Sequence, residues 1–231
     1  MSRGKVNERV LEQWEALLLF FQTESVTDKV DGAAEIYKTM TTSGTKRMLL
    51  FLNYVLKKVN IMNVELQSEY YRLHKLYPMI CGEYRNILGM FIKRDVLDRE
   101  KLSVIDPSDS KLHVALNRLN VGGRCEALLL KEPLGRNEDR FRSDCLQFLT
   151  VLCCQIRKRF PFKEDGVIAM LCNTDPNVAV SCNRQLNSII RLARHFPSLV
   201  SEDQYDKLQD EWEAIINAKE TIEPMLTLEN S

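Results

Sequence analysis

The sequence has no excess of either charge and no long hydrophobic run. Its 32 basic and 32 acidic residues cancel, so no net field draws the whole chain to nucleic acid or to a membrane surface. The longest apolar run, Ala16 to Phe21, is far shorter than the roughly 20 residues of a membrane span. The segment from Asn7 to Glu15 is charged where a signal peptide would be apolar. We therefore expect a nuclear or cytoplasmic protein that is neither secreted nor in a membrane.

Cysteine and histidine also lack any regular arrangement. The chain has an odd number of cysteines, and their positions follow no framework spacing: Cys81, Cys125, Cys145, Cys153, Cys154, Cys172 and Cys182. This argues against a secreted disulfide scaffold and predicts reduced thiols that pack as small hydrophobic groups. The histidines, His74, His113 and His195, form no close ligand set with them. We expect no metal ion and no other cofactor.

Motifs that would assemble a catalytic site are missing as well. Cys182 and His195 are thirteen positions apart in a helical pattern, which is about 20 Å along a rigid helix and argues against a cysteine nucleophile. The pair Gly122-Gly123 lacks the spacing and the lysine of a phosphate-binding loop and indicates a turn. Three acidic residues share what is typically a solvated helix face: Asp203, Asp206 and Asp210. This chain is therefore not expected to be an enzyme, and no small-molecule substrate is implied.

What the sequence has in abundance is apolar residues at helical spacing. The helices expected from this pattern cover residues 6–21, 28–39, 49–59, 137–160, 186–193 and 205–215. The first is apolar enough to lie well inside the fold. Asn137 is expected to cap the fourth, and Ser201 with Gln204 forms a capping-box pattern before the last. The predicted fold class is all-α, an irregular multi-helix bundle.

Between the N-terminal and the C-terminal helical segments, the helical spacing of apolar residues weakens and turn-forming residues are frequent. A short strand at Ala127 to Leu130 is an alternative there, although no second strand of similar quality exists to pair with it. The predicted organisation is an N-terminal helical segment 1–95, an irregular connecting region 96–136, a C-terminal helical segment 137–222 and a frayed tail 223–231. One continuous domain is the alternative.

One stretch carries the clearest periodicity, with apolar residues in alternating steps of four and three. Its positions are Leu66, Tyr70, Leu73, Tyr77, Ile80, Tyr84 and Ile87. Pro78 interrupts the pattern and predicts a kink or a break near Leu76 and Tyr77. Tyrosines at seam positions favour packing within the chain over a regular coiled-coil dimer. A groove that this face offers to a protein partner is the alternative.

Two groups of basic residues are candidates for phosphate contact. The first is Arg157-Lys158-Arg159, and the second is Arg184, Arg191 and Arg194, whose steps of seven and three place them on one helix face. Basic residues near a helix C-terminus also complement its dipole. We favour this second explanation, so that any DNA binding would be weak and sensitive to salt.

Several stretches carry a pattern that goes beyond helical periodicity. In chain order they are 9–14, 17–21, 46–57, the turn Asp175-Pro176, 192–200 and 208–212. Together they resemble hAT-superfamily transposases and their domesticated relatives. The resemblance covers most of the chain. It implies that the chain corresponds to the helical insertion of the family's ribonuclease H-like domain.

The same resemblance implies where the family's chemistry would lie. Family members cut DNA with two aspartates and a glutamate that hold divalent metal, and these would fall before Met1 and after Ser231. Asp175 belongs to a turn outside that triad, so no catalytic or metal-binding residue is carried over. The arginine-tryptophan pair that usually precedes the first helix is absent, and the family's zinc-binding DNA-recognition domain and dimerisation segment are not found.

Three functions remain open at this point. The first is a non-catalytic module derived from a transposable element, either associated with DNA or serving as a protein-interaction scaffold. The second is part of an active transposase, from a truncated gene product, whose acidic residues lie outside this chain and whose partners are other transposase subunits. The third is an unrelated helical adaptor that binds proteins.

Overall fold

The computed structural model describes residues 3–27, 32–67, 73–160, 162–163, 165–175 and 187–218. Within these residues the chain forms eleven α-helices and five short 3-10 helices and no β-strand, which confirms the all-α prediction. The short strand considered at 127–130 is wrong, because these residues lie in α7 (Gly123–Lys131). Its buried residues, Cys125 and Leu129, are one helical turn apart rather than alternating. Among the described helices, none has the length and hydropathy required to cross a membrane.

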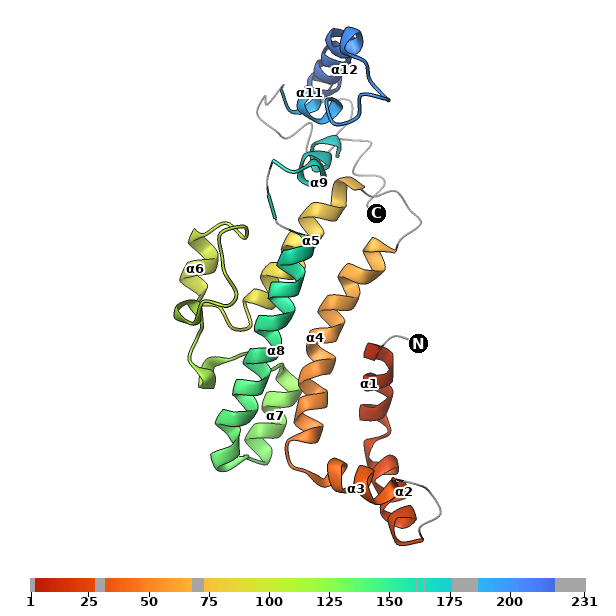
Figure 1. Ribbon diagram of the computed structural model, residues 1–231, viewed down its shortest axis with the longest axis vertical. Coiled ribbons are helices and arrows are strands. Elements are labelled where there is room, and N and C mark those ends of the chain that lie inside the picture. Colours follow the sequence, from red (N-terminus) through yellow and green to blue (C-terminus); the bar gives the residue numbers. More distant parts are fainter. Residues whose placement is uncertain are drawn as a thin grey trace. The chain divides into compact units, whose positions relative to one another are not determined.

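Two compact units make up the chain (Figure 1). Unit 1 consists of Met1–Val64 and Glu83–Phe160, and unit 2 consists of Glu65–Gly82 and Pro161–Ser231. Each unit therefore combines segments that are distant in sequence, whereas the predicted segments 1–95, 96–136 and 137–222 follow the order of the chain. The predicted tail, 223–231, lies outside the described residues.

Unit 1 is built around two helices of 22 residues each, α4 (Thr45–Leu66) and α8 (Glu138–Arg159). Phe51 of α4 and Phe148 of α8 meet edge to face, with ring centroids 5.8 Å apart. The remaining elements are α1 (Arg3–Glu12), α2 (Trp14–Thr27), α3 (Ala33–Thr41), the end of α5 (Leu73–Leu88), α6 (Arg94–Arg99), η1 (Ser110–Leu112), η2 (Leu116–Arg118), α7 and η3 (Gly135–Asn137). α4 and α8 thus contact each other in unit 1, and many of its largest buried side chains come from the end of α5 and the residues that follow it: Tyr84, Ile87, Leu88, Met90, Phe91 and Ile92.

The first predicted helix differs from the observed one in two ways. Residues 6–21 belong to two consecutive helices, α1 and α2, with Gln13 between them. The amide of Asn7 donates to the Leu49 carbonyl at 2.8 Å, which ties α1 to α4. By contrast, α2 is not inside the fold, because Leu19 is 65% exposed and Phe20 is 49% exposed. Hydrophobicity alone suggested burial, but α2 has apolar residues on every side and only part of them can face α3 and α4.

The predicted helix 137–160 is found as α8, and its buried face agrees only in part with the predicted one. Asn137 precedes it but makes no side-chain cap hydrogen bond. Its buried residues recur every fourth position and include one arginine: Phe141, Arg142, Cys145, Leu149 and Cys153. The apolar spacing of this segment predicts one inward face made of Phe141, Cys145, Phe148, Leu152 and Ile156. The first two are buried, and the other three are half-buried.

Pro78 lies inside α5, which runs without a break from Leu73 to Leu88. The predicted break near residues 76 and 77 is therefore wrong, whereas its alternative, a kink, stays a prediction. Proline removes one backbone donor, and here the lost bond is the one to the His74 carbonyl, in the first turn of the helix. A loss so close to the helix end leaves the following turns intact.

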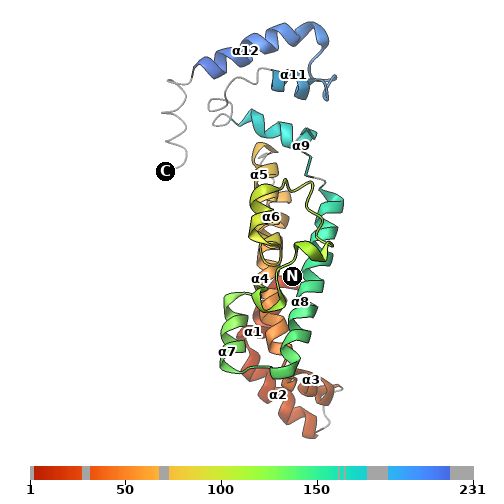
Figure 2. The ribbon, with the colours of Figure 1, turned by 90° about the vertical axis from the view of Figure 1, so that its left-hand side faces the viewer.

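Unit 2 has a small core of its own. Its elements include α9 (Val167–Met170), η4 (Leu171–Thr174), α11 (Asn187–Ala193), η5 (Glu202–Gln204) and α12 (Tyr205–Asn217), of which Figure 2 labels α9, α11 and α12. Buried Met170, Ile189 and Leu192 pack with partly buried Leu208 and Trp212. The predicted capping box is confirmed, since Ser201 N–H donates to Gln204 Oε1 at 3.3 Å before α12 begins.

Candidate functional site

The first predicted basic cluster lies at the end of α8, where its members have different surroundings. Arg157 is half-buried and donates to the Ser103 carbonyl at 2.8 Å, with the Asp106 carboxylate 3.8 Å away. Lys158 and Arg159 are exposed. The Arg157 side chain thus helps to hold the loop before η1, which leaves two of the three cations for contact with an outside partner.

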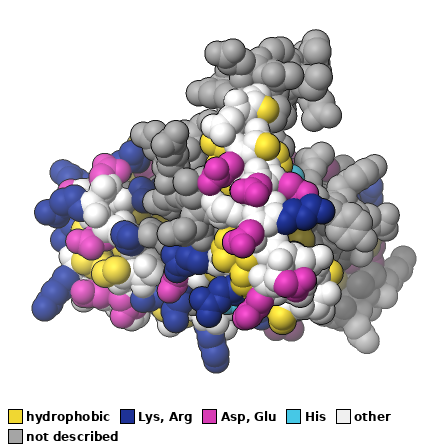
Figure 3. Space-filling model, turned by 90° about the horizontal axis from the view of Figure 1, so that it is seen from above, with side chains coloured by type: hydrophobic (Ala, Val, Ile, Leu, Met, Phe, Trp, Pro, Cys, Tyr) yellow, Lys and Arg dark blue, Asp and Glu magenta, His cyan; other side chains and the backbone are white. Residues whose placement is uncertain are grey.

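The second predicted cluster lies in unit 2 and is described only in part. Arg191 and Arg194 are exposed and one turn apart, at the end of α11 and just beyond it. Arg184 lies outside the described residues. Asp203, Asp206 and Asp210 are exposed, as expected of a solvated face. On the face shown in Figure 3, basic and acidic side chains are interspersed.

The periodic face predicted from 66 to 87 is divided between two helices. Leu66 ends α4 and Leu73 begins α5, and both are exposed, while Tyr70 lies outside the described residues. Tyr77 is half-buried. The remaining positions are buried: Ile80, Tyr84 and Ile87. Burial raises the pKa of the Tyr84 phenol, as expected for a core side chain rather than one at a protein surface.

Three cysteines of unit 1, Cys125, Cys145 and Cys153, are buried free thiols. Burial raises the pKa of Cys125 to about 12 and also raises the pKa of the other two. The Cys125 thiol donates to the Arg47 carbonyl at 3.4 Å. Because the thiolate is the nucleophile and the metal ligand, these side chains are suited to packing rather than to chemistry. Within the described residues, no group of three or more potential ligands is arranged to hold a metal ion.

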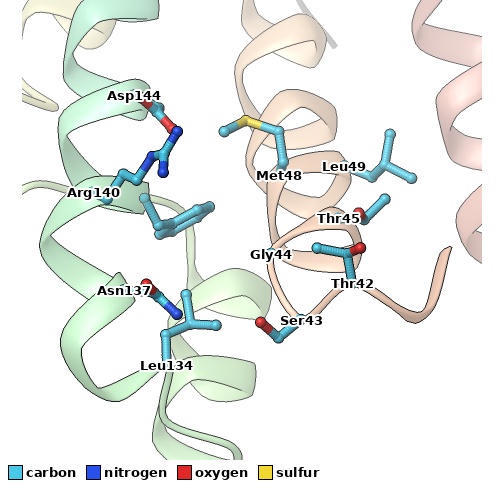
Figure 4. Close-up of a pocket in the computed structure, with 11 residues that line it drawn as sticks. Thr42, Ser43, Gly44, Thr45, Met48, Leu49, Leu134, Asn137, Arg140 and Asp144 are labelled. Carbon is cyan, nitrogen blue, oxygen red and sulfur yellow. The ribbon is translucent and has the colours of Figure 1, made fainter. Parts of the chain in front are cut away.

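A hollow of about 510 Å³ opens on unit 1 between the first turns of α4 and of α8 (Figure 4). Its apolar lining comes from Met48, Leu49, Leu134 and Phe141. Its polar and small lining residues are Thr42, Ser43, Gly44, Thr45, Asn137, Arg140 and Asp144. Apolar walls with a few polar groups are typical of binding sites. This hollow was not predicted from the sequence.

The connection between α3 and α4 keeps the hollow open. Thr45 Oγ1 donates to the Thr39 carbonyl at 2.7 Å, and Thr42 Oγ1 donates to the Lys38 carbonyl at 3.0 Å. These bonds fix the turn. Within it, Gly44 has no heavy atom within 4 Å of the position that a Cβ would take. The space therefore exists because the turn is fixed and a residue without a side chain lines it.

A second surface feature of unit 1 is an apolar stripe on α2, formed by Ala16, Leu19 and Phe20, which we call the α2 stripe. All three are exposed and lie at helical spacing on one side of α2. Phe20 contacts the edge of Phe21, with centroids 5.2 Å apart. A smaller hollow, about 440 Å³, involves only α3 and the glycine before it.

Taken together, these features offer surfaces for binding. The hollow and the α2 stripe offer apolar contact area, and the exposed charges are of both signs. Comparisons of the chain with protein-family models, with curated proteins and with solved structures found no match. What the chain binds is therefore inferred from its own residues.

Proposed function

We propose that the chain is a non-catalytic helical module of the hAT-transposase type that serves as a protein-interaction scaffold. The observation that carries the scaffold function is the preformed hollow on unit 1, together with the exposed α2 stripe. A contiguous apolar patch on the surface of a folded chain often marks an interaction site. The family part of the proposal is supported by the ordered sequence stretches and is compatible with an all-helical chain.

The frame around the hollow is held by two buried arginines, which favours binding without large rearrangement. Arg47 donates to the carbonyls of Ser43 and Glu132, so it joins the start of α4 to the end of α7. Arg142 joins α8 to α7 through Glu126. A preformed site avoids part of the ordering cost of association. Met48 in the lining adds an adaptable side chain to this frame.

Filling the hollow is expected to weaken the binding of a hydrophobic probe. Native chain at low concentration should bind the dye anilinonaphthalene sulfonate saturably, because the apolar lining can take its rings and Arg140 its sulfonate. Gly44 lines the hollow and has open space at its Cβ position, so the side chain of Gly44→Leu should take up part of the hollow. We expect the dissociation constant to rise about tenfold, equivalent to ~1.4 kcal/mol. Fluorescence titration measures it.

Gly82→Leu is the matched control. Gly82 also has no heavy atom within 4 Å of its Cβ position, but it lies on α5 rather than in the hollow. It should leave the titration unchanged, and circular dichroism should show native helix content in both variants. Equal dye binding by the two variants would contradict a scaffold function of the hollow.

DNA association is the second candidate function, favoured by the exposed pair Arg191 and Arg194. Fluorescence anisotropy with a labelled duplex should show weak binding at low salt that disappears as salt is raised. The double variant Arg191→Ala, Arg194→Ala should lower the slope of the logarithm of the binding constant against the logarithm of the salt concentration. The decrease should be the one expected for the loss of about one to two phosphate contacts. Lys207→Ala, an exposed cation on α12, is the control. Binding that is absent at low salt, or unchanged in the arginine variant, removes this function.

A further inference from the structure

We propose that the occupant of the hollow is a second copy of this chain, which inserts its α2 stripe so that two copies form a reciprocal, two-fold symmetric dimer. This inference rests on the proposed scaffold function and names its partner. Both surfaces belong to unit 1, so each copy carries a projecting part and a receiving part on one compact body.

The two surfaces have matching chemistry. Leu19 and Phe20 project from α2 with about half or more of their surface in water. The receiving side presents Met48, Leu134 and Phe141. Bringing the two together removes apolar area from water on both sides, which is the main driving force of association. Ala16, at the third position of the stripe, is small enough to let the helix come close to the rim.

The charges of the two surfaces also fit. α2 carries Glu15 and Glu24 and no basic side chain, and the eight residues between the two glutamates are uncharged. The rim of the hollow carries Arg140 and, one turn later on α8, Asp144. Glu15 lies one turn before Leu19 but is paired with Lys46 Nζ of its own chain at 2.8 Å. Glu24 lies one turn after Phe20, so α2 can place this glutamate opposite Arg140. Asp144 then faces the uncharged part of α2.

Symmetry explains why such a contact would form between two identical chains. One stripe in one hollow involves only a few side chains. The area that this single contact buries is therefore smaller than the ~1,000 Å² that a specific interface usually buries. A two-fold axis makes the same contact twice, since residue i meets j and j meets i. The expected result is a weak dimer with a dissociation constant on the order of tens of micromolar.

Sedimentation velocity of the full chain over a wide concentration range measures this dimer directly. The weight-average sedimentation coefficient should rise with concentration from the monomer value to the dimer value. Leu19→Ser with Phe20→Ser removes the projecting part, and Gly44→Leu fills the receiving part. Each should raise the dissociation constant at least tenfold. Both stripe residues are exposed and Gly44 faces open space, so the fold should be kept; circular dichroism and thermal melting check this.

The rim charge has its own matched pair of variants. Arg140→Glu should weaken the dimer by about threefold to tenfold, because a glutamate then faces an acidic side chain of α2. Arg136→Glu makes the same charge change at an exposed position outside the hollow and should have little effect. An equal effect of both variants would mean that net charge, rather than a contact with Arg140, controls association.

Mixing the two apolar variants tests reciprocity. The stripe variant keeps an open hollow, and the Gly44→Leu variant keeps its stripe, so an equimolar mixture can form one of the two contacts. Association should therefore partly return in the mixture although it is absent from each variant alone. A dimer that neither variant weakens overturns the proposal.

The same experiments separate this inference from the function on which it rests. A wild-type chain that is monomeric at every concentration and still binds the dye in the hollow overturns self-pairing, and the scaffold then serves another protein. A chain that neither associates nor binds the dye overturns both proposals.

Discussion

Gly122→Ala is expected to lower the free energy of unfolding of unit 1 by about 4 kcal/mol. Gly122 precedes α7 with φ 89° and ψ 141°, a conformation that residues with a Cβ rarely adopt. A Cβ at this position would also lie 2.7 Å from Cγ of Tyr54 and 2.9 Å from its Cβ. These atoms are close to the backbone of α4 and cannot swing away as the tip of a flexible side chain can. Backbone strain and overlap therefore add.

The measurement is urea unfolding followed by the fluorescence of Trp14, in a Trp212→Phe background that leaves the remaining tryptophan in unit 1. Gly123→Ala is the control, because its Cβ meets no heavy atom within 4 Å and its φ is not positive. It should be neutral or slightly stabilising. Adding Tyr54→Ala to Gly122→Ala should relieve the overlap with the tyrosine ring but neither the contact with Cβ of residue 54, which alanine keeps, nor the backbone strain. A cost below about 1 kcal/mol for Gly122→Ala would contradict this account.

The sequence predicted the long helices well and their buried faces less well. α8 was expected at 137–160 and is found at Glu138–Arg159, because a continuous apolar period and the following Pro161 mark both its extent and its end. The buried face is shifted because Arg142 takes one of the inward positions. An apolar pattern gives no signal for a buried arginine, whose place depends on partners from η2, α7 and its own helix.

The hollow could not be predicted for a related reason. Its lining comes from two segments, 42–49 and 134–144, that are far apart in sequence. Helical spacing shows which side of a helix is apolar, but not which turns of two helices face each other. The α2 stripe was visible as sequence, since Ala16 to Phe21 is the longest apolar run. The sequence did not show that the α2 stripe is exposed, because its burial depends on whether other helices of the fold can cover it.

Arg142→Met is expected to destabilise unit 1 by about 3 kcal/mol. The Arg142 residue is 5% exposed and its guanidinium donates to Glu138 Oε1 at 2.9 Å, to Glu126 Oε1 at 3.0 Å and to the Leu119 carbonyl at 3.3 Å. Burial alone would lower its pKa, but hydrogen bonds with the two glutamates raise it, so the charged form is held firmly. Methionine fills much of the volume and leaves all three acceptors without this donor.

The expected cost is smaller than the largest values for a broken buried ion pair, which reach about 5 kcal/mol. Both carboxylates keep contact with water, with side chains 43% and 32% exposed for Glu126 and Glu138. Leu119 is buried, so its carbonyl loses a partner that water cannot easily replace. Arg142→Lys keeps the charge but cannot reach all three acceptors, and should cost about 1–2 kcal/mol. Arg136→Met, at an exposed position, should be nearly neutral.

Removing the two glutamate charges from Arg142→Met shows why this variant loses stability. The stability is lost either because the carboxylates are left without a donor or because the cation itself is missing. In Arg142→Met combined with Glu126→Gln and Glu138→Gln, no carboxylate remains beside the apolar side chain, so part of the lost stability should return. The part that does not return belongs to the Leu119 carbonyl and to the lost link between α7 and α8. If the triple variant is no more stable than Arg142→Met, the unpaired carboxylates contribute little. If the free energy of unfolding of Arg142→Met lies within about 1 kcal/mol of the native value, Arg142 does not hold α7 to α8 as its contacts indicate.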